Sequence, residues 1–206
     1  MDGSGARAPR APQGRLAGTG IYPINQVDIA YFVARAVDLF TYSRPSAPCA
    51  LERVELRDLV AGLAADPSSW VHLVRHDPAQ RVFECLRLDD EVEIWLICWM
   101  PGHDTGFHDH DLSSGAVVVA QGSVVEERLR LGGAPEVRRY VPGDVFDFSP
   151  VDIHRVTHAG STPATTVHAY SPPLRRMGAY LVEPSGTLQR HPLAKGEELR
   201  PLTSAA

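Results

Sequence analysis

The sequence predicts a mainly β protein, a barrel or jelly roll with two helices before it, and three observations lead to this prediction. Short runs rich in β-branched and aromatic residues follow one another after about residue 70, with Gly, Pro and Asp turns between them. No helical pattern separates these runs, so a parallel α/β sheet is not expected. Both helical patterns of the chain come earlier, between about residues 25 and 66.

The N-terminal part of the chain is expected to hold a tail and two helices. Residues 1–20 are mostly Gly, Ala, Pro and Arg, which bury too little to offset their conformational entropy, so we expect a disordered tail. From Asn25, a residue type suited to a helix N-cap, apolar residues recur at helical spacing as far as Phe40. A second, shorter helix is predicted over 56–65, and the Asp66-Pro67 turn ends it.

The rest of the chain is expected to form the barrel and a C-terminal strap. A chain of 206 residues suits one domain, which we place at 21–206. Its parts are the helices at about 25–66, the barrel at about 70–183 and an extended strap at 184–206, where the sequence becomes polar and contains Pro. The β-rich runs cover residues 93–99, 115–131, 137–141, 144–149, 154–159 and 165–171.

The composition argues against several classes of partner. A formal charge of -5 without any block of basic residues offers no electrostatic footprint for nucleic acid or an anionic membrane. No stretch approaches the ~18 consecutive apolar residues of a spanning helix, and the N-terminus lacks the apolar core of a secretory signal, so we expect a cytoplasmic protein. The three cysteines (Cys49, Cys85 and Cys98) have no CxxC or CxxH spacing and are expected to be reduced thiols.

Six of the nine histidines fall between residues 103 and 168, and three of them predict a metal site. His108 and His110 are two residues apart, so on a strand both side chains point to the same face, where one metal ion can accept a nitrogen from each. A third ligand is expected from a later strand. His154, after the Gly143-Asp144 turn, is the candidate.

These segments resemble the two sequence motifs of the cupins. The first motif, with its glycine and histidine spacing, runs from Gly102 to Gly122, and Gly115 stands where many cupins place a glutamate ligand. Without that carboxylate the resemblance implies a neutral three-histidine site with additional open coordination positions. The second motif, which contains His154, is a looser match. The expected fold is therefore the cupin double-stranded β-helix.

Within the cupins, residues 70–180 resemble the cysteine dioxygenase family. The resemblance rests on ICWMPGHDTGFHDH (97–110), the Gly143-Asp144 turn, DIHRV (152–156) and VHAYSPP (167–173), in the family's order and spacing. It implies Fe²⁺ held by three histidines, a small-molecule thiol and dioxygen as substrates, and a sulfinic acid product. It also implies a relay of hydroxyl, imidazole and phenol near the metal, which maps onto Thr166, His168 and Tyr170.

The residue pattern independently favours that relay. Thr166, His168 and Tyr170 alternate along one strand and so share one face, where a hydrogen-bonded chain through the three side chains is sterically natural. A phenol held at the end of such a chain can act as a general acid. The alternative is an ordinary core pair of His168 and Tyr170 satisfied by the backbone.

Two departures from the family bear on the substrate. Gly115 stands where the animal enzymes have the cysteine that is joined to the relay tyrosine, so no such crosslink can form. Glu84 and Cys85 align with the family's carboxylate-binding arginine, and Arg81 or Arg87 can supply a cation from a neighbouring position. The substrate therefore need not be cysteine. Thiols with an amine or a quaternary ammonium group, such as cysteamine or ergothioneine, also suit a glutamate in the pocket.

Two other functions stay open at this point. One is a three-histidine cupin enzyme that holds zinc, nickel or manganese and acts on a substrate other than a thiol. The other is a cupin that binds a small ligand without turnover. The sequence predicts a monomer or a homodimer, since cupins often pair through sheet edges.

Overall fold

The computed structural model describes residues 50–130, 132–193 and 197–203, which belong to one compact unit of the chain. The predicted tail at 1–20 and the predicted helix at 25–40 lie outside the described residues and stay predictions. The predicted second helix is confirmed as α2 (Arg53–Ala65), which begins three residues earlier than expected. It is followed by two short 3-10 turns, η2 (Pro67–Ser69) and η3 (Val71–Leu73).

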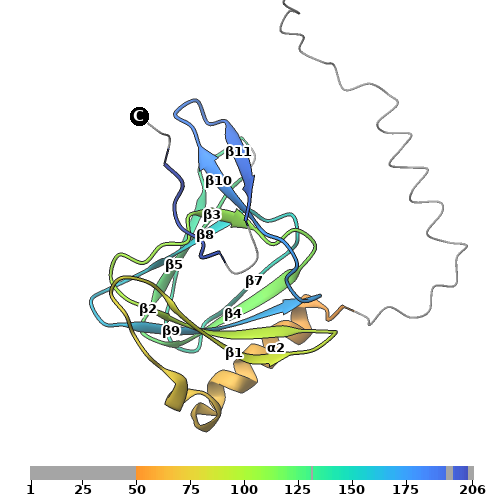
Figure 1. The fold of residues 1–206 in the computed structure, drawn as a ribbon, viewed down its shortest axis with the longest axis vertical. Coiled ribbons are helices and arrows are strands. Elements are labelled where there is room, and N and C mark those ends of the chain that lie inside the picture. Colours follow the sequence, from red (N-terminus) through yellow and green to blue (C-terminus); the bar gives the residue numbers. More distant parts are fainter. Residues whose placement is uncertain (1–49, 131, 194–196, 204–206) are drawn as a thin grey trace, which may run out of the picture. The chain divides into compact units, whose positions relative to one another are not determined.

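The barrel consists of two antiparallel sheets, as the sequence predicts (Figure 1). One sheet has the order β1-β2-β9-β4-β7, and the other has the order β11-β10-β3-β8-β5-β6. The strands are β1 (Val82–Leu88), β2 (Glu93–Trp99), β3 (Phe107–Asp109), β4 (Ser114–Gln121), β5 (Val124–Arg128), β6 (Glu136–Tyr140), β7 (Val145–Phe148), β8 (His154–His158), β9 (Ala164–Ser171), β10 (Gly178–Val182) and β11 (Leu188–Pro192).

The five-stranded sheet is buried on both faces, because its strands alternate between two cores. Helix α2 packs against β4, β7 and β9 and covers the outer face, where Leu56 and Val60 meet Ile94 and Leu96 of β2 (Figure 1). The neighbouring positions of β2, Ile97 and Trp99, join the second core between the two sheets. All eight residues of β9, the central strand of this sheet, are buried, because both faces of the sheet are covered here.

The run at 115–131 forms two strands in different sheets, β4 and β5, instead of the single β-rich run seen in the sequence. The chain changes sheets at Gly122, which has a φ of +69°. A Cβ on Gly122 would lie 2.4 Å from the Pro163 carbonyl oxygen, so a larger residue fits neither the conformation nor the space.

The C-terminal region is more ordered than the predicted strap. Residues 188–192 form β11, which pairs with β10, and β10 in turn pairs with the histidine-bearing strand β3. Asp109 of β3 fastens this hairpin: its carboxylate accepts hydrogen bonds from Arg190 Nε at 2.6 Å and from the Tyr180 hydroxyl at 2.7 Å. Local sequence patterns could not predict this pairing, because the partners of Asp109 lie about 70 to 80 positions away.

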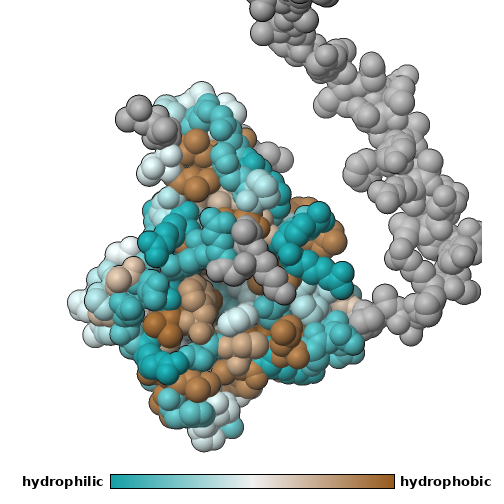
Figure 2. All heavy atoms as spheres, in the orientation of Figure 1, coloured by the Kyte–Doolittle hydropathy of each residue, from teal (hydrophilic) through white to brown (hydrophobic). Residues whose placement is uncertain are grey.

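Hydrophobic residues on the face seen in Figure 2 form small groups among hydrophilic ones, which is ordinary for a protein surface. Over the described residues, no helix combines the length and the apolar character needed to cross a bilayer.

Candidate active site

Three histidine side chains converge between the two sheets. His108 lies on β3 directly opposite His154 of β8, and His110 follows two residues later, just beyond the end of β3. Each offers a ring nitrogen, and these nitrogens lie within 4.8 Å of one another. The three side chains are almost completely buried, with 2–3% of their surface exposed. The structure thus brings together the three residues that the sequence predicts as metal ligands.

Hydrogen bonds at Nδ1 orient the rings of His108 and His154. His108 Nδ1 lies 3.0 Å from the Gly106 carbonyl oxygen, which can only accept, so Nδ1 carries the proton and Nε2 keeps its lone pair. His154 Nδ1 lies 2.8 Å from the Glu126 carboxylate, which leaves His154 Nε2 as a buried nitrogen without a hydrogen-bond partner. Rings held in this way present unprotonated nitrogens to one point, as a metal ion requires.

Burial keeps His108 and His110 neutral. Desolvation, followed by the charge on the neighbouring histidines, holds the pKa of both His108 and His110 well below the usual histidine range. His110 Nδ1 is also buried without a partner among the described residues. Orphaned buried nitrogens are uncommon in proteins, and a bound metal ion is the ordinary explanation for several in one place. The residues therefore fit a divalent transition metal.

Phe148 fills the place where other cupins carry a fourth ligand. Its ring stacks on His110, with 4.3 Å between the ring centroids. A Cβ added to Gly115 would lie 2.2 Å from Phe148 Cζ, so no side chain fits at Gly115 while Phe148 is there. Gly115 also pairs directly with Tyr170 across β4 and β9. Neither a glutamate ligand nor a cysteine partner for Tyr170 can enter this position without moving Phe148.

Glu126 is a site residue that the sequence analysis missed. Its side chain is 4% exposed, and besides His154 it contacts Arg128 at 2.8 Å and the Tyr140 hydroxyl at 3.2 Å. Burial alone would raise the pKa of Glu126, but the hydrogen bonds from His154 and Arg128 lower it, so the carboxylate stays charged. The available signal in the sequence was the spacing in VVEER, where Glu126 stands two positions after Val124 and therefore shares a strand face with it.

The predicted relay residues form a continuous hydrogen-bonded chain on β9. Thr166 Oγ1 lies 2.7 Å from His168 Nε2, and His168 Nδ1 lies 3.2 Å from the Tyr170 hydroxyl. The chain extends one residue further than predicted, because Trp99 Nε1 donates to Thr166 Oγ1 at 2.8 Å.

The distances favour one direction for the protons. Thr166 accepts from Trp99 and then has one hydrogen to donate, either to His168 Nε2 at 2.7 Å or to the Ile97 carbonyl at 3.5 Å. The shorter contact places the imidazole proton on Nδ1, where it is donated to the oxygen of Tyr170. The hydroxyl hydrogen of Tyr170 is then left for an acceptor inside the cavity.

His168 and Tyr170 both hold their protonation states near neutral pH. Burial, followed by the charges of His154 and Arg81, lowers the pKa of His168 to about 3, so this imidazole is neutral. Burial, with the nearby charge of Glu93, raises the pKa of Tyr170 well above its usual value. Tyr170 is therefore a phenol and not a phenolate.

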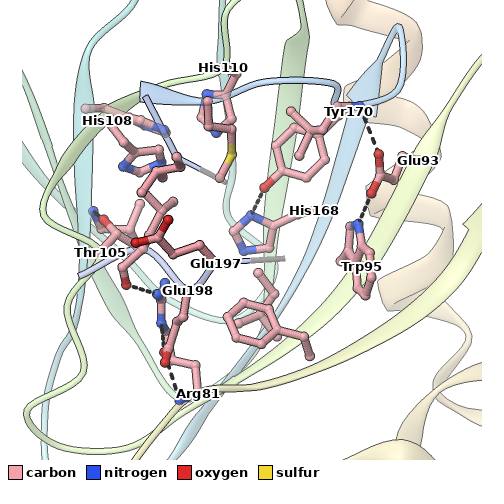
Figure 3. Close-up of a pocket in the computed structure, with 18 of the residues that line it drawn as sticks. Arg81, Glu93, Trp95, Thr105, His108, His110, His168, Tyr170, Glu197 and Glu198 are labelled. Carbon is pink, nitrogen blue, oxygen red and sulfur yellow. Dashed lines mark hydrogen bonds and ion pairs between the residues drawn. The ribbon is translucent and has the colours of Figure 1, made fainter. Parts of the chain in front are cut away.

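The histidines and the relay share one cavity of about 710 Å³ (Figure 3). Aromatic side chains supply much of its wall. Arg81 and Glu198 lie on the side opposite Tyr170, and His108, His110 and His168 face the space between them. His154 also lines this cavity. The aromatic lining residues are Phe83, Trp95, Trp99, Phe148 and Tyr170.

Of the four residues predicted to bind substrate, only Arg81 lines this cavity. Glu84 faces away from it and pairs with Arg75. Cys85 is exposed. Arg87, the other predicted source of a cation, does not share a face with Arg81, because a register shift between Cys85 and Arg87 interrupts the strand alternation. It pairs instead with Asp89 at the surface.

Comparisons with known proteins agree with the site. The cysteine dioxygenase type I family profile matches residues 47–182. Cysteine dioxygenase type 1 of Danio rerio is 23% identical over 132 residues, which cover 59% of this chain and 66% of that protein. The Homo sapiens protein of the same name is 21% identical over 136 residues, which cover 61% of this chain and 68% of that protein. The matched segment thus spans about two thirds of these relatives.

Similar solved structures include a cupin superfamily protein from Desulfitobacterium hafniense, with a TM-score of 0.43 and 18% identity over 51% of this chain and 89% of that one. An uncharacterized conserved protein with a double-stranded beta-helix domain from Klebsiella pneumoniae has a TM-score of 0.45 and 18% identity, covering 52% of this chain and 84% of that one.

Proposed function

The chain belongs to the cysteine dioxygenase type I family, and from this premise we propose that it is an iron(II)-dependent thiol dioxygenase. The proposed reaction adds both atoms of dioxygen to the sulfur of a small thiol, R–SH + O2 → R–SO2H. It balances without a further reductant, because the thiol supplies all four electrons.

One observation carries this proposal: three buried histidine rings with converging nitrogens and a Thr-His-Tyr hydrogen-bonded chain open into the same cavity. A ligand-binding cupin without turnover has no use for the chain beyond packing. A neutral three-histidine set without a carboxylate also leaves coordination positions for two small molecules at once.

His108, His110 and His154 would hold the iron, which supplies the redox chemistry for dioxygen and a positive charge that favours the thiolate form of the substrate. Glu126 would keep His154 in the tautomer that binds, and the Gly106 carbonyl would do the same for His108. Phe148, stacked on His110, excludes water from one side of the site.

Tyr170 would hold a proton at its hydroxyl for the oxygen atoms of the reacting group. His168 donates to the Tyr170 oxygen and orients it, and Thr166 and Trp99 fix the tautomer of His168 through their own hydrogen bonds. Tyr170 would thus act as a general acid. The chain that supports it is uncharged, since His168 is a neutral imidazole and Tyr170 a neutral phenol over the physiological pH range.

A cytoplasmic setting, in which thiols stay reduced, suits this chemistry. The two cysteines in the described part of the chain, Cys85 and Cys98, are free thiols in the structure. Small-molecule thiol and dioxygen are the proposed partners, and a monomer or homodimer stays the prediction for the assembly.

The proposal is tested by reconstituting the purified protein with iron(II) under anaerobic conditions and then admitting oxygen. Oxygen uptake and sulfinate formation are followed with cysteine, cysteamine, 3-mercaptopropionate and ergothioneine, beside the His108→Ala variant. We expect thiol-dependent uptake that is lost in the variant. Iron-loaded protein that consumes no oxygen with any thiol would argue for a non-thiol substrate instead.

A further inference from the structure

The C-terminal segment 197–203 contributes to the candidate active site. Glu198 and Leu199 line the cavity together with the three histidines. The segment's backbone also packs tightly against the turn before His108: a Cβ on Gly106 would lie 2.8 Å from Pro201 Cα and 2.9 Å from the Arg200 carbonyl oxygen. Residues about ninety positions beyond the histidine pair thus form part of the substrate space (Figure 3).

This segment contacts the buried cation Arg81. It is 4% exposed, and its guanidinium lies between two aromatic rings, 5.3 Å from the centroid of Phe83 and 5.2 Å from that of Trp99. One oxygen of Glu198 accepts from Arg81 twice, from Nε at 3.2 Å and from the backbone N–H at 3.3 Å. Arg81 Nη2 donates to the Leu199 carbonyl.

The position of Arg81 makes its charge relevant to the substrate. Trp99, on which it stacks, donates to the relay through Thr166. A buried arginine without an anion strongly favours a ligand carboxylate, because a buried charge requires a partner. Glu198 already provides that anion from within the chain, and its second oxygen is held by Arg200 at 2.8 Å.

Three other charged residues of the cavity wall, Glu93, Arg175 and Arg176, do not provide a free cation for a substrate carboxylate deep in the cavity. Glu93 is held by neutral donors, Trp95 Nε1 at 2.6 Å and the Leu174 N–H at 2.8 Å, and so adds a negative charge to the wall. Arg176 pairs with Asp111 at 2.9 Å, and both Arg175 and Arg176 are exposed, where solvent screens their charge. Apart from the iron that the three histidines would hold, which would pair with the thiolate sulfur, the described residues offer a carboxylate no uncompensated cation deep in the cavity.

We propose that Glu198 is a specificity-determining residue, which neutralises Arg81 so that the site takes small thiols without a negative charge in preference to thiol carboxylates. This inference rests on the proposed thiol dioxygenase function and names its substrate class. Amine-bearing and neutral thiols meet an aromatic-walled cavity in which Arg81 is already paired and Glu93 adds a negative charge, whereas a thiol carboxylate must either lose its hydration without a partner or displace Glu198 from Arg81.

The test uses three thiols of similar size and different charge: 3-mercaptopropionate, 3-mercaptopropanamide and cysteamine. Their dissociation constants are measured by calorimetry with the anaerobic, iron-loaded protein, and their kcat/KM values by sulfinate formation. The variants are Glu198→Gln, the double variant Arg81→Gln/Glu198→Gln and the control Glu136→Gln. Glu136 undergoes the same chemical change in an exposed ion pair with Arg130, outside the cavity.

We expect the wild-type protein to bind 3-mercaptopropionate at least about tenfold more weakly than the neutral amide. Glu198→Gln should shift this ratio toward the acid by about tenfold or more, as expected when a charge-assisted pair becomes available to the ligand. The double variant should cancel the shift, since the unpaired Arg81 is its cause, and Glu136→Gln should leave the ratio unchanged.

Wild-type preference for the acid, or a ratio that stays within about twofold in Glu198→Gln, would overturn the inference. Binding is measured without oxygen, so charge selection is tested even if no thiol is turned over. If the thiols bind in the predicted order but none is turned over, only the proposed reaction is contradicted. If thiols are turned over but the ratio of acid to amide affinity is unchanged in Glu198→Gln, only this inference is contradicted.

Discussion

Replacing Glu126 by glutamine is expected to weaken iron binding while leaving the fold intact. Glutamine keeps the size of the side chain and an oxygen that can accept from His154 Nδ1, so the change removes the negative charge and little else. The bond at stake is 2.8 Å long and joins side chains that are 2% and 4% exposed, where water screens the charge little.

The size of the effect follows from this geometry. A hydrogen bond to a buried charged group contributes about 1.5–3 kcal/mol, and part of this acts through the basicity of His154 Nε2. Loss of such a supporting partner typically costs about 10–100-fold in metal affinity. We expect about tenfold weaker iron(II) binding in Glu126→Gln and up to about 100-fold in Glu126→Ala, which also loses the bond.

The assay is competition for iron(II) against a chelator of known affinity, under anaerobic conditions, with thermal unfolding as a check on the fold. Glu127→Gln is the matched control: it is the next residue along β5, pairs with Arg155 at 3.4 Å and is 26% exposed. Equal iron affinity in wild type and Glu126→Gln, or equal losses in Glu126→Gln and Glu127→Gln, would refute the proposed role of the buried carboxylate.

Three further predictions follow. Tyr170→Phe should bind iron and thiol as the wild type does but form sulfinate about 100-fold more slowly, as expected for loss of a general acid; unchanged turnover would remove the relay from the chemistry. Gly115→Cys should lower the free energy of unfolding by about 1–3 kcal/mol in denaturant titrations, because its Cβ meets Phe148, and the same substitution should cost less when it is measured in a Phe148→Ala background. In the metal-free protein, the lowered pKa of His168 means that the unfolded chain binds a proton first as the pH falls. The free energy of unfolding should therefore decrease between about pH 6.5 and the folded pKa of about 3, by up to about 1.4 kcal/mol per pH unit from this group, and His168→Gln should flatten the slope.

Local patterns in the sequence predicted most of the barrel. Strand β2 matches its predicted bounds, and the alternation that placed Thr166, His168 and Tyr170 on one face of β9 does produce their hydrogen-bonded chain. These features depend on period-two geometry and on turns, both of which are properties of a few neighbouring residues.

Features that depend on long-range packing were not predicted. Glu126 reaches His154 across 28 positions through the pairing of β5 with β8. Glu198 reaches Arg81 across 117 positions and comes from the segment that was predicted to form an extended strap. A single β-bulge was enough to turn Arg87 away from the face of Arg81, because a shift of one residue moves a side chain to the other side of the sheet.

The most direct test of the proposed function is a single-turnover reaction of the iron-loaded protein with cysteamine under ¹⁸O2, analysed by mass spectrometry beside the His154→Ala variant. The proposal predicts that both oxygen atoms of the sulfinate carry the label and that the variant forms no sulfinate. A product with label in only one oxygen atom or in none, or labelled sulfinate at the wild-type rate from His154→Ala, would contradict a dioxygenase built on these three histidines.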